Sequence, residues 1–268
     1  MTTVSITNPT PADTTRTAAP LRVSNVTKTY LKGTFKTLDN VSFNLRANEI
    51  TAFVGPSGCG KTTMLRIIAG LEFPSNGRVE AFGKPVLGPG PDRGMIFQAY
   101  TSFPWLTAFK NVEYGMRVMG VPKAERQERA HQFLKLVHLE RFADAYPKSL
   151  SGGMKQRVAL ARTLAQNPSI LLMDEPFGAL DPITREALGR ATRDLHDKLS
   201  LTTMMVTHDV QEALLLADRI LVMAGGKLLA DATPRELLRG HPDPAVAALI
   251  DTPARQARAL SALMEAGA

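Results

Sequence analysis

Short apolar runs alternate with amphipathic segments over most of the chain. Apolar and polar positions alternate in LRVSNVTKTY (21–30) and VSFNL (41–45), which predicts half-exposed strands, whereas EITAFVG (49–55) is apolar almost throughout and predicts a buried strand. The segment KTTMLRIIAGL (61–71) has the spacing of a helix. A buried strand, a glycine-rich loop and a helix in this order predict the start of a parallel α/β sheet.

The pattern from about residue 101 to residue 166 is helical instead. AERQERAHQFLKLV (124–137) predicts one helix, and Ser151 opens another that stops near Pro168. The α/β alternation then resumes in strand-like SILLMDE (169–175) and TTMMVTH (202–208), helical ITREALGRATRDLHDKL and VQEALLLA, a strand pair in RILVMAGGKLLA, and a last helix at Pro234 to Leu238.

Three parts follow from this pattern. We expect a disordered Thr-, Ala- and Pro-rich leader at 1–20, a compact unit at 21–240 in which about 101–166 is an inserted helical subdomain, and an Ala-rich tail at 241–268. The leader lacks the apolar centre of a secretory signal, and the apolar runs are far shorter than the ~20 residues that span a bilayer. The sequence therefore predicts a soluble or peripheral protein.

Charge and cysteine content narrow the class of protein. The 268 residues carry a formal charge of +7, which suggests an acidic partner such as a nucleotide, a nucleic acid or an anionic membrane face. Cys59 is the single cysteine, which excludes an intrachain disulfide and fits a reducing cytosol.

The run GPSGCGKT (55–62) matches the phosphate-binding pattern G-x-x-x-x-G-K-[ST] between a predicted strand and a predicted helix. Its glycines let backbone N–H groups face phosphate, Lys61 reaches the β and γ phosphates, and Thr62 offers a hydroxyl to Mg²⁺. The alternative is that residues 55–62 form a glycine-rich turn that binds no phosphate. We interpret Cys59 as a space-filler, because no base stands beside it. The predicted ATP-binding residues here are Gly55, Pro56, Ser57, Gly58, Cys59, Gly60, Lys61, Thr62 and Thr63.

Polar side chains also follow three predicted strands. Asp174 and Glu175 end ILLMDE, where Asp174 is placed to hold Mg²⁺ and Glu175 to polarise a water, provided that the strand ends there, as Pro176 suggests. Gln98 follows GMIF, and His208 follows MMVT. A lone histidine or an acidic turn is more often structural, but the recurrence of polar strand ends favours a shared site for the γ-phosphate and the attacking water.

A second anion site is predicted at the start of the later helix. Ser151 is a cap residue, and Gly152 and Gly153 leave the backbone N–H groups of the first turn accessible. A single chain does not need two binding sites for the γ-phosphate. If two copies pair head to tail, residues 151–153 of each copy would contact the ATP bound to the phosphate loop of the other. A capped, closely packed helix is the alternative.

These motifs together resemble those of the ATP-binding cassette proteins, from Leu21 to Leu238 and in the family's order. The resemblance implies a P-loop NTPase with a RecA-like core, an antiparallel β subdomain and an inserted α-helical signature subdomain. It implies that Glu175 is the general base and that His208 senses the γ-phosphate. The resemblance also implies that Thr62, Gln98 and Asp174 bind Mg²⁺. It implies that Tyr30 stacks on adenine and that Asp181 couples the two ATP sites of the dimer. The further ATP-binding residues that it implies are Tyr30, Ser151, Gly152, Gly153, Gln156 and Asp181.

The resemblance is greatest to the nitrate, taurine and alkanesulfonate importers of bacteria. It implies a peripheral ATPase subunit on the cytoplasmic face of the inner membrane, two permease subunits and an extracytoplasmic solute-binding protein. In YTSFPWLTAFKNV (100–112), Phe103, Trp105 and Phe109 would anchor a permease helix, although each could equally fill the subdomain's own core. We expect no nucleic-acid partner. The alternatives are an ATPase switch acting on a non-membrane partner such as nucleic acid, and a module that does not hydrolyse ATP.

Overall fold

The computed structural model describes residues 19–99, 101–251 and 255. The predicted leader therefore falls almost wholly outside the described residues, as does the end of the predicted tail. Within the tail, residues 244–251 are helical.

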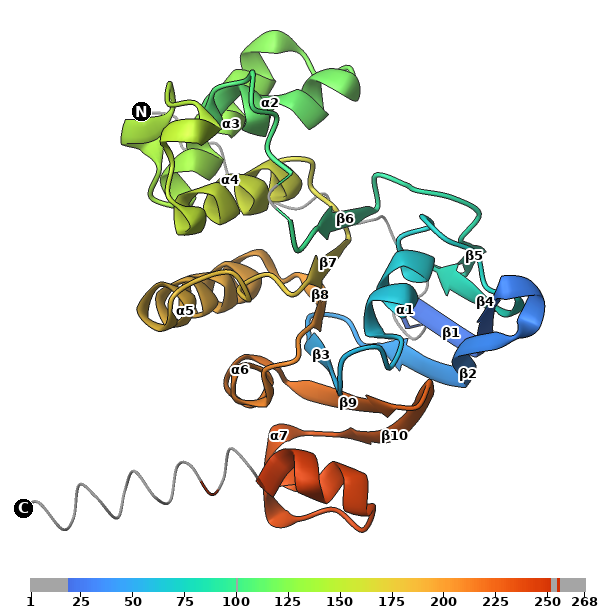
Figure 1. The fold of residues 1–268 in the computed structure, drawn as a ribbon. Coiled ribbons are helices and arrows are strands. Elements are labelled where there is room, and N and C mark those ends of the chain that lie inside the picture. The colour runs from blue at the N-terminus through green and yellow to red at the C-terminus, as the bar shows by residue number, and fades with distance from the viewer. Residues whose placement is uncertain (1–18, 100, 252–254, 256–268) are drawn as a thin grey trace, which may run out of the picture.

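Two sheets form the centre of the molecule (Figure 1). The first is antiparallel, in the order β2 (Phe35–Leu45), β1 (Leu21–Tyr30), β4 (Asn76–Ala81), β5 (Lys84–Pro85). The second is in the order β10 (Lys227–Ala232), β9 (Arg219–Ala224), β3 (Ile50–Val54), β8 (Thr202–Val206), β7 (Ile170–Asp174), β6 (Arg93–Ile96). Its strands run parallel except β10, which pairs antiparallel with β9.

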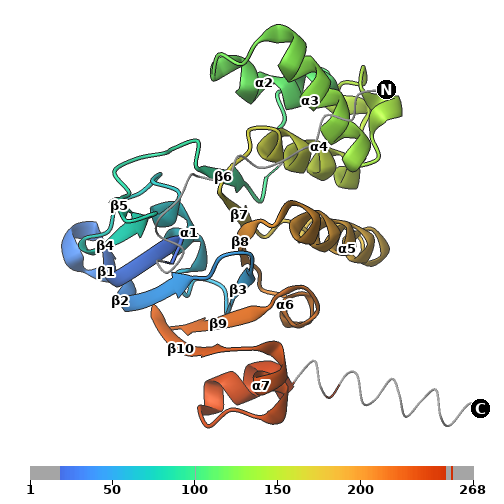
Figure 2. The ribbon, with the colours of Figure 1, turned by 180° about the vertical axis from the view of Figure 1, so that it is seen from behind.

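The helices divide between the two faces of the parallel sheet (Figure 2). On one side lie α1 (Lys61–Ile68) and the antiparallel sheet; on the other lie α5 (Pro182–Leu199) and α6 (Val210–Leu216). The helical layer above them contains α2 (Ala108–Val118), α3 (Lys123–Leu136), α4 (Gly152–Leu164). The shorter elements are the 3₁₀ turns η1 (Leu31–Gly33), η2 (Glu140–Phe142), η3 (Pro147–Ser149) and the helix α7 (Pro234–Arg239).

The hydrophobic core lies on both faces of the parallel sheet, because side chains along its buried strands point alternately to one face and the other. Every residue of β3, β7 and β8 is buried, including the threonines of β3 and β8, as in a sheet that is covered on both faces. Successive side chains still point to opposite faces. Phe53 packs toward α1 and the antiparallel sheet, whereas its neighbours Ala52 and Val54 pack toward the helices of the other side. The result confirms the predicted fold, a P-loop core with an antiparallel sheet and a helical insertion.

One helix of the insertion was not predicted. Residues 108–118 form α2, and Thr107 caps it by accepting a hydrogen bond from the backbone N–H of Lys110 (3.2 Å). The sequence pattern there is dominated by aromatic residues, which drew the interpretation toward a docking surface. The N-cap threonine was the signal that predicts a helix start.

Candidate functional site

The loop between β3 and α1 has a conformation that depends on glycine. Gly55 has φ +152°, and a Cβ atom there would lie 2.0 Å from the Met223 carbonyl oxygen. Gly60, which begins α1, has φ +106° and equally little room. The bare start of α1 and the turns of the loop present backbone N–H groups on one side, which is a phosphate-binding geometry.

Lys61 lies inside this loop rather than in solvent. Its ammonium donates hydrogen bonds to the carbonyl oxygens of Gly55 (2.8 Å) and Pro56 (3.0 Å), and the residue is only 5 % exposed. Cys59 is buried beside it, with Sγ 3.8 Å from the ammonium, and fills space against Gly55. The loop therefore holds a positive charge at its centre, where anionic oxygens would replace its carbonyl contacts.

A hydroxyl and a carboxylate meet at the first turn of α1. The Thr62 hydroxyl donates to Asp174 Oδ1 (2.9 Å), at the end of β7. Burial raises the pKa of Asp174, and the hydrogen bond from Thr62 opposes that rise. These two oxygen ligands suit Mg²⁺, which binds few protein side chains and takes its other ligands from water and phosphate.

Glu175 ends β7 in a strained conformation that turns its side chain away from that of Asp174. Its φ is +44°, in the left-handed region that residues other than glycine rarely adopt, and its backbone N–H donates to the Val206 carbonyl (2.9 Å). The strand therefore ends where Pro176 predicts. The two adjacent carboxylates face different partners, as a division of roles requires.

The Glu175 carboxylate joins the ends of three neighbouring strands. Gln98, after β6, donates from Nε2 to Oε2 of Glu175 (2.9 Å). His208, after β8, has Nδ1 3.3 Å from Oε1. Because β6, β7 and β8 are adjacent and parallel, their carboxyl ends share one edge of the sheet, next to the loop at 55–62.

His208 lies in a turn fixed by its neighbours. The Thr207 hydroxyl donates to Glu212 Oε2 (3.0 Å), and Asp209 caps α6 by accepting from the N–H groups of Gln211 (2.9 Å) and Glu212 (3.2 Å). Arg185 of α5 reaches Asp209 (3.3 Å). Burial raises the pKa of Glu212 to about 7. This network was not predicted from the sequence, although Asp209 in front of a helical run is an N-cap signal.

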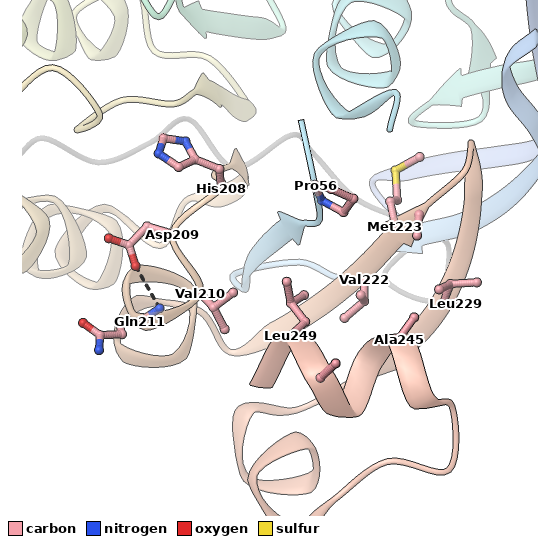
Figure 3. A pocket seen from close by; sticks show the side chains of 12 residues that line it. Pro56, His208, Asp209, Val210, Gln211, Val222, Met223, Leu229, Ala245 and Leu249 are labelled. Carbon is pink, nitrogen blue, oxygen red and sulfur yellow. Dashed lines mark hydrogen bonds between the residues drawn. The ribbon is translucent and has the colours of Figure 1, made fainter. Parts of the chain in front are cut away.

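A cavity of about 690 Å³ lies behind this turn (Figure 3). Pro56 and His208 stand at one end of it, and most of the wall is apolar. The apolar lining residues come from α6, β9, β10 and the helical segment 244–251: Val210, Val222, Met223, Ala224, Leu229, Ala245, Ala248 and Leu249. Such walls do not suit phosphate groups, so the cavity adjoins the phosphate loop without being the phosphate site.

The start of α4 is capped and partly open to solvent. The exposed Ser151 accepts a hydrogen bond at Oγ from the N–H of Met154 (3.3 Å). Gly153 packs so closely on α5 that a Cβ atom would lie 2.6 Å from Thr184 Cγ2. Asp181 caps α5 in turn, and hydrogen bonds from Thr184 hold the pKa of its carboxyl below the usual value. The N-termini of α4 and α5 therefore lie next to each other.

Gln156 differs from the other residues predicted to contact ATP. It is 4 % exposed and lies among Ile96, Phe177 and Thr192, between α4 and the parallel sheet. A side chain in that position packs α4 onto the core and does not reach a ligand at the surface. We correct its predicted role accordingly.

Tyr30 ends β1 and remains 36 % exposed. Its hydroxyl lies near Thr63 and Arg66 of α1 and donates a hydrogen bond to Glu72. This places the ring beside the first turns of the helix that follows the phosphate loop. The contact with Glu72 was not predicted.

The predicted permease anchors have different surroundings. Trp105 is 69 % exposed, and its ring centroid lies 5.5 Å from that of Phe103. Phe109 instead packs against the helical core and the ring of His131 (4.5 Å). The buried side chain of Asn111 binds the backbone of Phe103 through both its carbonyl (2.8 Å) and its amide (3.2 Å). Trp105 is thus an exposed aromatic residue on a loop that the Asn111 side chain fixes, whereas Phe109 packs in the core of the helical subdomain.

Comparison with known proteins decides the family. Residues 38–178, more than half of the chain, match the family model described as ABC transporter. The chain belongs to the ABC transporter family. Among the described residues of this ABC ATPase, no helix has the length and apolar character that crossing a bilayer requires.

Relatives and solved structures agree with that membership. An ABC transporter ATP-binding protein of Methanocaldococcus jannaschii is 52 % identical over 210 residues, 78 % of this chain and 79 % of that protein. The nitrate import ATP-binding protein of Synechocystis is 45 % identical over 206 residues, 76 % and 77 % of the two chains. The ATP-binding cassette MJ0796, solved as a dimer with ADP and Pi, is 36 % identical with a TM-score of 0.70, covering 80 % of this chain and 99 % of that one.

Proposed function

We propose that this ABC ATPase powers a membrane importer by binding and hydrolysing MgATP between two copies of the chain. The convergence of Gln98 and His208 on Glu175, beside Lys61 and Thr62, is the observation that carries the proposal. A module that only binds nucleotide would have no need to hold a carboxylate in a strained turn next to the phosphate loop.

The phosphates of ATP would bind the backbone N–H groups of residues 55–63, with the Lys61 ammonium between the β and γ phosphates. Thr62 and Asp174 would hold Mg²⁺, with the Gln98 amide oxygen as a further ligand. In the described part of the chain, no three histidine, cysteine or carboxylate side chains cluster as a metal site. Mg²⁺ held at Thr62 and Asp174 would neutralise charge on the phosphate oxygens.

Glu175 would act as the general base. Its carboxylate accepts the proton of the attacking water, while the hydrogen bond from Gln98 and the nearby His208 ring fix its orientation. His208 would also face the γ-phosphate and report the presence of that group to α6, the helix that Asp209 caps. Tyr30 would stack on the adenine base.

The starts of α4 and α5 would serve the partner copy. Ser151 is exposed and Gly152 is partly exposed, whereas Gly153 is buried against Thr184 of α5. Asp181 lies at the adjacent helix start. A two-fold, head-to-tail dimer would place each such start over the phosphate loop of the other chain. The dimeric state of the ATP-binding cassette MJ0796 supports this arrangement.

Two permease subunits would bind at the loop that presents Trp105, and an extracytoplasmic binding protein would deliver the solute. The solute would be a small anion of the nitrate, taurine or sulfonate type, which the nitrate import relative supports. The chain would lie peripherally on the inner membrane of a bacterium. A nucleic-acid partner is not favoured, because the relatives compared are transporter subunits.

Trp105→Ala tests the membrane partner. We expect affinity-tagged protein to co-purify with two integral membrane subunits from detergent-solubilised membranes of its own cells. Loss of the exposed ring should reduce that yield by about tenfold or more, since aromatic anchors dominate such contacts. ATP hydrolysis by the isolated chain should not change.

Leu87→Ala is the matched control, because Leu87 is as exposed as Trp105 but lies elsewhere in the chain. It should leave the yield of membrane subunits intact. Wild-type protein that binds no membrane protein, and whose ATPase activity rises with added nucleic acid, would overturn the importer assignment.

A further inference from the structure

Three side chains near the end of β1 form a cluster that the motifs do not include. Lys28 and Tyr30 are two residues apart in β1, so they point to the same face of the strand. Glu72 lies in the segment that follows α1. The cluster is thus built between the antiparallel sheet and the helix of the phosphate loop.

Glu72 is the centre of this cluster. Its Oε1 accepts a hydrogen bond from the Tyr30 hydroxyl and lies 3.1 Å from the Lys28 ammonium. Lys28 also donates to the Phe73 carbonyl (2.7 Å). The two side chains of the ion pair are mostly buried, unlike an ordinary surface pair.

The Tyr30 ring is therefore held at two places. Its hydroxyl is fixed by Glu72, and the Lys28 ammonium stands 5.0 Å from the ring centroid, a cation–π distance. Burial, and next the hydrogen bond to Glu72, raise the pKa of the Tyr30 hydroxyl, so it stays protonated and remains a donor. The part of the ring that remains exposed is available to a ligand.

The position of the ring suggests which ligand that is. The Tyr30 hydroxyl lies near Thr63 and Arg66, in the first two turns of α1. A nucleotide whose phosphates bind at residues 55–63 has its base within reach of this surface. An aromatic ring held in one orientation loses less conformational freedom when it stacks than a free one does.

We propose that Glu72 and Lys28 are positioning residues that hold the Tyr30 ring for stacking on the base of ATP. This inference rests on the proposed function and names residues that set its affinity for the base. The competing account is that the cluster only ties the segment after α1 to β1, so that Tyr30 contributes a ring and nothing depends on its hydroxyl.

Tyr30→Phe separates the two accounts, because it keeps the ring and removes only the donor. We expect the Kd for ATP, measured by calorimetry, to rise about three- to tenfold. The Kd for tripolyphosphate, which has no base, should not change. Glu72→Ala should give the same pattern, and Glu72→Gln, which keeps an acceptor, should retain most of the affinity.

The double variant is the decisive arm. Adding Glu72→Ala to Tyr30→Phe should cost little further affinity for ATP, because the contact between the Tyr30 hydroxyl and Glu72 is already lost and Lys28 keeps its hydrogen bond to the Phe73 carbonyl (2.7 Å). Glu80→Ala, which removes an ion pair with Arg78 on the same sheet, is the control and should bind ATP normally.

A Tyr30→Phe variant that binds ATP as tightly as wild type would overturn the inference, as would equal weakening of ATP and tripolyphosphate binding in Glu72→Ala. Failure of the proposed function has a different signature: wild-type protein would then either not hydrolyse ATP or hydrolyse it without binding membrane subunits. Calorimetry reports binding independently of turnover, so the two failures are distinguishable.

Discussion

Glu175→Gln should lower the rate of ATP hydrolysis by about 10²- to 10⁴-fold, the contribution that a positioned general base makes. The amide cannot take the proton of water, but it has the shape of the carboxylate and leaves Lys61 and Thr62 in place. The affinity for ATP should therefore be retained or improved, since a negative charge beside the γ-phosphate is removed. Phosphate release under saturating MgATP and calorimetric titration measure the two effects.

Glu236→Gln is the matched control for that substitution. Glu236 completes the capping box of α7, a position where glutamine serves as well, and its carboxylate is exposed. Its hydrolysis rate should equal that of wild type. Normal turnover by Glu175→Gln would remove Glu175 from the chemistry and leave its strained turn without a catalytic reason.

Glu212→Gln should change how stability depends on pH. Burial raises the pKa of Glu212 from 4.5 to about 7, so the folded state holds its proton where the unfolded chain has lost it. The contribution of Glu212 to the free energy of unfolding therefore falls as pH rises from about 4.5 to about 7, by at most about 3 kcal/mol in total. Asp209 adds to the rise in the pKa of Glu212, while Arg185 and His208 oppose it.

Glutamine at this position does not titrate and still accepts the hydrogen bond from Thr207. Relative to wild type, the variant should gain about 2–3 kcal/mol in unfolding free energy between pH 5 and pH 8, measured by urea denaturation. Glu236→Gln should show no such trend, because the pKa of Glu236 lies below this range. A wild-type-minus-variant difference that stays constant with pH would contradict the burial of a neutral carboxyl.

Sequence predicts those features of the site that local physics determines. The glycines of the phosphate loop and the polar residues after apolar strands have short-range signals, and the shared edge of a parallel sheet then brings Gln98, Glu175 and His208 together. Pro176 marked the end of β7 correctly. The fold class followed from the same alternation of buried strands and helices.

The contacts that were not predicted from the sequence are single hydrogen bonds between segments that lie far apart in the chain. Glu72 holds Tyr30, and Arg162 of α4 donates to the Thr101 carbonyl (2.8 Å), yet nothing in the local pattern of either residue marks its partner. Gln156 shows the converse error. Its place inside a motif suggested a ligand contact, whereas the face of α4 on which it lies is buried.

The central claim is that ATP joins two copies of the chain, with the start of α4 in one copy closing on the phosphate loop of the other. Light scattering on Glu175→Gln, with and without MgATP, tests it most directly. The account predicts a monomer without ATP and a dimer with it, and a monomer under both conditions when Gly152→Asp places a carboxylate at that helix start. A double variant that dimerises with ATP as fully as Glu175→Gln, or a Glu175→Gln protein that stays monomeric at saturating ATP, would contradict it.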